Sequence, residues 1–188
     1  SSGCSVTAPT STQTTGHKDT YEYATKAVYT PAASAADYQQ PPTGYALVFS
    51  ELLARHGSRG LSSPKYDHIS LNIWQSAQQQ NQLTAAGKAL GSEIQRMMDA
   101  NIAMGYGNLS ELGKLEHAGI GQRLAERNKT LFQQQADKEI LVEYSGKQRA
   151  KDSGLAFSHG LTEANPALQQ VISAPVANPE TLYFHKQP

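Results

Sequence analysis

The chain has 188 residues, and its 16 basic and 16 acidic side chains leave it with no net charge. This balance argues against a nucleic-acid-binding protein, which needs a basic field on its surface, and no apolar run approaches the length of a membrane span. The length is enough for one domain with a sizeable core.

The N-terminal region, residues 1–44, is expected to be a disordered or extended arm. Its first 20 residues are rich in Ser and Thr, and residues 21–44 include three prolines. The single cysteine, Cys4, excludes a disulfide within the chain, and it follows small residues as at a bacterial lipoprotein acylation site. A lipid anchor at Cys4 and a free thiol are the two alternatives. Both fit an exported protein of the bacterial periplasm or outer membrane.

The first apolar run, residues 45–54, is predicted to form a buried strand, and a cationic turn follows it directly. In open α/β sheets, ligands bind at the carboxyl ends of the strands. In this turn Arg55 and Arg59 flank His56, and two guanidiniums beside one imidazole suit a phosphate group. In such a pocket the imidazole can act as a nucleophile. The alternative is a charged loop in solvent, but the position after a strand and before a Ser-Ser-Pro turn favours the anion site.

Two amphipathic helices are predicted next. The first runs from Leu83, with apolar residues spaced three and four apart, to glycines at positions 105 and 107. The second runs from Glu116, and His117 at its start is expected to cap the helix or to face solvent.

The remaining elements complete an alternating pattern. Residues 139–144 are predicted to form a strand, residues 148–161 a helix, and residues 181–184 a third, short strand. Strand, helices, strand and helix in this order indicate an α/β fold with right-handed crossovers. Arg149 opens the helix that follows the second strand, and taken alone it is expected to be a helix-start charge that faces water.

Two segments together resemble a known family. Arg-His-Gly-x-Arg after the first core strand resembles the signature of the histidine phosphatase superfamily, in its acid phosphatase and phytase branch, and residues 60–67 are similar to bacterial multiple inositol polyphosphate phosphatases. The family then shows a strand, an Arg and a Ser-containing helix that ends in Phe-x-x-Gly-Leu, which matches Arg149 and residues 157–161. The resemblance extends over residues 45–185.

The resemblance implies a fold, a reaction and a site. The fold is a sheet flanked by helices with a helical subdomain, and residues 45–188 form the N-terminal part of the catalytic domain. The reaction is hydrolysis of phosphate from inositol polyphosphates through a phosphohistidine, without metal or cofactor. The implied catalytic residues are His56, Arg55, Arg59 and Arg149; the three arginines also bind substrate, and Lys65 binds its outer phosphates.

The family also places a second His later in the sequence, in a His-Ala-Glu or His-Asp motif that brings the proton donor. In this chain His159 precedes Gly160 and His185 precedes Lys186, so neither forms that motif. We therefore expect the chain to be the N-terminal half of an enzyme, with the C-terminal remainder present as a second chain. Two other functions stay open, namely a sugar or general acid phosphatase, and a phosphate-binding surface protein that has lost catalysis.

Overall fold

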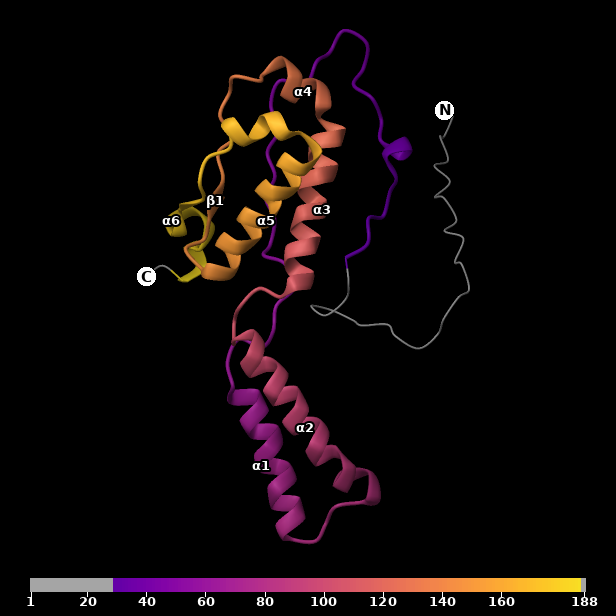
Figure 1. Cartoon of the computed structure of the whole chain (residues 1–188), viewed down its shortest axis with the longest axis vertical. Coiled ribbons are helices and arrows are strands. Elements are labelled where there is room, and N and C mark those ends of the chain that lie inside the picture. Colours follow the sequence, from indigo (N-terminus) through magenta and orange to yellow (C-terminus); the bar gives the residue numbers. More distant parts are fainter. Residues whose placement is uncertain (1–28, 187–188) are drawn as a thin grey trace, which may run out of the picture.

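The structure is a computed structural model that describes residues 29–186. Cys4 and most of the predicted N-terminal arm lie outside the described residues. Figure 1 shows a body that contains α3, α4, α5 and β1, and a hairpin of α1 and α2 that extends away from it. The element bounds are α1 Lys65–Gln79, α2 Ala85–Met104, α3 Glu111–Arg127, α4 Lys129–Gln134, β1 Glu143–Tyr144, α5 Gln148–Ala164, β2 Val176–Ala177 and α6 Pro179–Leu182, with short 3-10 helices at Ala35–Asp37, Pro166–Gln170 and Phe184–Lys186.

The body is organised around the packing of α3 on α5. Glycines allow the two backbones to meet: a Cβ added to Gly160 would lie 1.9 Å from the carbonyl oxygen of Ala118, and one added to Gly121 would lie 2.2 Å from that of Phe157. A buried apolar cluster continues from this contact to the 3-10 helix after α5. It comprises Ala125, Leu161 and Leu168, with Leu124, Phe132, Ile140, Phe157, Val171 and Ile172 packed against them.

The described sheet is small and parallel. β1 pairs with β2 in the register Glu143 to Val176 and Tyr144 to Ala177, and an isolated bridge joins Ile140 to Ile172. The predicted strand at 139–144 is therefore present in its last two residues. The predicted strand at 181–184 is wrong: Asn178 accepts the N–H of Thr181 with its side chain and Pro179 occupies the first turn, so α6 begins there instead.

The predicted strand at 45–54 is also wrong as a strand. The segment has no ladder partner among the described residues, and its side chains are largely exposed, with Val48 at 76% and Leu53 at 81%. An apolar run predicts burial, but a strand exists only where a neighbouring backbone supplies its hydrogen bonds. One contact ties the segment to the body: the Nδ2 group of Asn128 donates to Ser50 Oγ at 3.1 Å.

The α1–α2 hairpin is the helical subdomain of this chain. Thr84 caps α2 by accepting the N–H of Gly87 at 3.0 Å, and Gly105, at φ +83°, ends the helix. Trp74 of α1 donates its indole N–H to the carbonyl of Gly87 at 2.8 Å and packs against Gly91. Within residues 29–186, no helix is both long and apolar enough to cross a bilayer.

Candidate active site

The cationic turn after residue 54 lies against the first half of α3. The carbonyl oxygen of Ser58 accepts two hydrogen bonds from Ser110, the N-cap of α3: from its N–H at 2.9 Å and from its hydroxyl at 2.8 Å. Gly57 and Gly113 touch through their backbones, since a Cβ on Gly57 would lie 2.6 Å from the carbonyl oxygen of Gly113. The turn is therefore fixed by main-chain contacts that only glycine permits.

His56 is held in one tautomer. Its Nδ1 lies 2.9 Å from the carbonyl oxygen of Gly57. Because a carbonyl can only accept, the proton of the neutral ring is on Nδ1, and the lone pair is on Nε2.

Three arginines converge on His56. Burial lowers the pKa of His56, and the charges of Arg149, Arg55 and Arg59 lower it further, against the opposing effect of the hydrogen bond to Gly57. Burial and the charges of Arg149 and Arg55 likewise lower the pKa of Arg59. Within residues 29–186, the charged side chains that act directly on the pKa of His56 are these three arginines. The ring is therefore neutral in a positively charged site, as a nucleophile that attacks an anionic phosphoryl group needs to be.

Arg149 reaches the site from the first turn of α5. Its Nη1 lies 4.0 Å from the position that a Cβ on Gly107 would occupy, so the turn before α3 lies beside the guanidinium. Its buried Nε has no hydrogen-bond partner in the described part of the chain. Ser153, one turn further along α5 and 4% exposed, donates its hydroxyl to the carbonyl of Arg149 at 2.8 Å and accepts the N–H of Gly57 at 3.1 Å. One hydroxyl thus links the two predicted motifs.

Two side chains of α3 that the sequence did not single out hold the turn. Glu116 accepts the N–H of Ser58 at 2.9 Å and its hydroxyl at 3.1 Å. His117 is buried, not at a cap or in solvent as expected, and its Nε2 donates to the carbonyl of Arg55 at 3.0 Å. Burial lowers the pKa of His117, while its contact with Arg55 and the charge of Glu116 raise it. Both lie one turn after Gly113, on the face of α3 that meets the cationic turn, and no local pattern in the sequence identifies that face.

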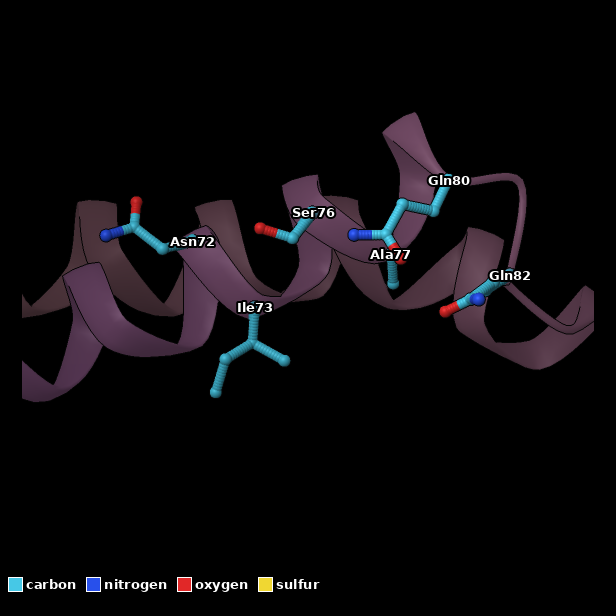
Figure 2. A pocket seen from close by; sticks show the side chains of 6 residues that line it. All are labelled: Asn72, Ile73, Ser76, Ala77, Gln80 and Gln82. Carbon is cyan, nitrogen blue, oxygen red and sulfur yellow. The ribbon is translucent and has the colours of Figure 1, made fainter.

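Lys65 is the one predicted site residue that stands apart. It begins α1 and is exposed, and its side chain makes no hydrogen bond or ion pair with the described residues. Its role stays a prediction. A shallow depression on the hairpin, shown in Figure 2, is lined by uncharged residues of the second half of α1 and the turn after it, away from the cationic turn. In residues 29–186 no group of three or more His, Cys, Asp or Glu side chains is arranged to hold a metal ion.

Comparison with known proteins gives the family. The family model described as the histidine phosphatase superfamily, branch 2, matches residues 46–181. The chain belongs to this superfamily. The match contains the cationic turn, α3 and Arg149, so the site described above lies inside the family domain. A search of curated proteins finds no match.

Solved structures agree in fold. The multiple inositol polyphosphate phosphatase of Bifidobacterium longum in complex with inositol hexasulfate is 35% identical, with a TM-score of 0.79, over 85% of this chain and 35% of that chain. Its complex with phosphate is 36% identical with a TM-score of 0.78, again over 85% and 35%, and its apo form is 37% identical with a TM-score of 0.74, over 81% and 33%. The chain therefore spans about a third of the length of these neighbours, which is consistent with an N-terminal half.

Proposed function

We propose that this chain carries the phosphate-binding and nucleophilic part of a phosphomonoesterase that hydrolyses inositol polyphosphates through a phosphohistidine. The observation that carries the proposal is the environment of His56: Nδ1 is bound to the Gly57 carbonyl, and Arg55, Arg59 and Arg149 are the charges that act on the ring. The superfamily supports phosphatase chemistry. The similarity to the Bifidobacterium longum enzyme, which binds inositol hexasulfate, supports the substrate class.

The proposed reaction begins with attack of Nε2 of His56 on phosphorus. The N–P bond forms while the bond from phosphorus to the leaving oxygen breaks, and the arginines neutralise the phosphoryl oxygens as charge develops on them. The proton on Nδ1 stays there, because the Gly57 carbonyl holds it. Water then hydrolyses the phosphohistidine and releases phosphate. Lys65, exposed at the start of α1, is proposed to bind outer phosphates of the substrate.

The leaving alkoxide needs a proton donor. Since the charged groups that act directly on His56 within residues 29–186 are arginines, we propose that a carboxylic acid on the C-terminal remainder of the enzyme supplies this proton. We propose the same remainder as the partner of the apolar segment 45–54, whose backbone has no ladder partner among the described residues. Both roles would be served by one polypeptide that completes the sheet.

The test is a pair of variants with a covalent trap. His56→Ala should abolish phosphate release from inositol hexakisphosphate, and His159→Ala, an exposed histidine on α5, should not. Quenching the wild type with labelled substrate should give an acid-labile phosphohistidine, and mass spectrometry of the same sample should show the accompanying polypeptide. Substantial turnover by His56→Ala would refute the nucleophile, whereas phosphate binding without turnover in any preparation would favour the non-catalytic alternative. A monomeric, active chain of 188 residues would refute the need for a second polypeptide.

A further inference from the structure

The peptide group between Gly57 and Ser58 is hydrogen-bonded at both ends. Its carbonyl oxygen accepts Nδ1–H of His56 at 2.9 Å, and its N–H donates to Oε2 of Glu116 at 2.9 Å. The C=O and the N–H belong to one conjugated, planar amide. A carboxylate at the N–H end therefore polarises the carbonyl at the other end, as happens in any chain of hydrogen bonds inside a protein.

The carboxylate of Glu116 is available for this role. It accepts the Ser58 N–H, the Ser58 hydroxyl at 3.1 Å and the N–H of Tyr29 at 3.3 Å, all of which are neutral donors. Among the ion pairs in residues 29–186 none involves Glu116. Its negative charge is thus not paired with a cation there. It raises the pKa of the neighbouring His117, and it also acts on the Ser58 peptide that it binds.

We propose that Glu116 is a positioning residue that acts on His56 through the Gly57–Ser58 peptide. The catalytic role of this contact rests on the proposed function, whereas the contact itself is observed independently of that function. When Nε2 bonds to phosphorus, the ring becomes cationic and its Nδ1–H becomes a stronger donor. The carbonyl polarised by Glu116 then accepts more strongly, so the carboxylate stabilises the phosphohistidine without touching it.

The surroundings of His56 explain why a negative charge near Nδ1 would favour the proposed reaction. Burial and the three arginines all disfavour positive charge on the ring. The same arginines are needed to bind the phosphoryl oxygens, so they cannot be removed to make the ring more basic. A negative charge placed behind the ring, on the side of Nδ1, offsets their effect on His56 without competing with the substrate for the guanidiniums. Glu116 occupies that side, since it binds the peptide that carries the Nδ1 acceptor.

The test is Glu116→Gln, which keeps the shape and an acceptor oxygen but removes the charge. The matched control is Glu111→Gln on the same helix, an exposed carboxylate that pairs with Lys114 instead of the cationic turn. NMR titration of ¹⁵N-labelled histidines in the protein as isolated, with any accompanying polypeptide, reports the pKa of His56. We expect Glu116→Gln to lower this pKa by about half a unit, the scale of a unit charge acting across one peptide group. Glu111→Gln should leave it unchanged.

Kinetics separate this role from a merely structural one. Loss of a charge-assisted hydrogen bond should lower kcat roughly tenfold, with KM little changed because Glu116 does not face the substrate. An unchanged pKa of His56 in folded Glu116→Gln would overturn the proposal even if activity fell. If the pKa of His56 shifts in Glu116→Gln but neither the wild type nor the variant hydrolyses inositol phosphates, the proposed function is refuted. The effect of Glu116 on His56 through the Gly57–Ser58 peptide is then still supported.

A measurement on the wild type tests the proposal even if Glu116→Gln does not fold. In an acid titration of the wild type, the Ser58 amide proton and the Nδ1 proton of His56 should change their chemical shifts together, because one carboxylate acts on both. If the chemical shift of the Ser58 amide proton changes and that of the Nδ1 proton does not, the proposed effect of Glu116 on His56 through the peptide is refuted.

Discussion

Replacing Arg149 by Ala should lower kcat/KM by two to three orders of magnitude and leave the fold intact. Of the three arginine charges that act on His56, that of Arg149 has the largest effect on its pKa. Its buried Nε has no hydrogen-bond partner within residues 29–186, so no described interaction of that group is lost with the side chain. Removal of one preorganised donor to a developing oxyanion costs roughly 10²–10³-fold in rate. The expected loss follows if Arg149 is such a donor.

The pH dependence provides a second signature of the same variant. Because the Arg149 charge lowers the pKa of His56, its removal should raise that pKa, and the acid limb of kcat/KM should move to higher pH. The assay is steady-state phosphate release from inositol hexakisphosphate over a pH series, with circular dichroism to verify folding. Arg96→Ala is the matched control, since Arg96 is 73% exposed on α2 and pairs only with Glu93. A loss below about threefold, with an unmoved acid limb, would place Arg149 outside the site and refute the reasoning.

Two further predictions concern stability. Gly160→Ala should destabilise the protein by about 1–3 kcal/mol, because the new Cβ would lie 1.9 Å from a backbone oxygen of α3. The control is Gly119→Ala, whose Cβ would meet only the flexible end of Arg123. In thermal unfolding this control should be neutral or stabilising. Acid should also destabilise the fold: burial lowers the pKa of His56 and of His117 below 6.5, so the folded state binds fewer protons than the unfolded state. The stabilisation from these two neutral histidines is complete above pH 6.5 and is lost as the pH falls through their folded-state pKa values. A thermal unfolding midpoint that does not change with pH across this window would contradict the assignment. So would a midpoint that depends on pH equally steeply in His117→Gln.

The sequence predicted the cationic cluster because its information is local. Arg55, His56 and Arg59 are neighbours in the chain, and Arg149 opens a helix directly after a strand signal. The side chains that hold this cluster were missed because their partners are remote: Glu116 lies 58 positions from Ser58, and Ser153 lies 96 positions from Gly57. A hydroxyl or carboxylate on a helix gives no sign in the sequence of the backbone group that it will bind.

The errors in secondary structure have physical causes as well. Residues 45–54 carry the apolar character of a strand, but pairing depends on a second backbone that the described residues do not provide. Helix α1 was not among the predicted elements, and its larger apolar residues, such as Ile69 and Ile73, are exposed at 43% and 67%. Its position on α2 is set by polar anchors at two points: the indole of Trp74 donates to the carbonyl of Gly87, and the buried carboxylate of Asp67 accepts hydrogen bonds from Asn101 at 3.0 Å and from the hydroxyl of Tyr106 at 2.7 Å.

Taken together, the contacts divide the proposed enzyme into two tasks. The geometry of His56 is fixed inside this chain: Gly57 packs against α3, Glu116 binds the Gly57–Ser58 peptide and Ser153 binds the preceding peptide. The same chain supplies the three arginine charges around the ring. We therefore expect the proposed phosphate capture and nucleophilic attack to depend on contacts between the turn, α3 and α5. Protonation of the leaving group and closure of the sheet are the tasks that we assign to the rest of the enzyme, so damage there should impair turnover before it impairs phosphate binding.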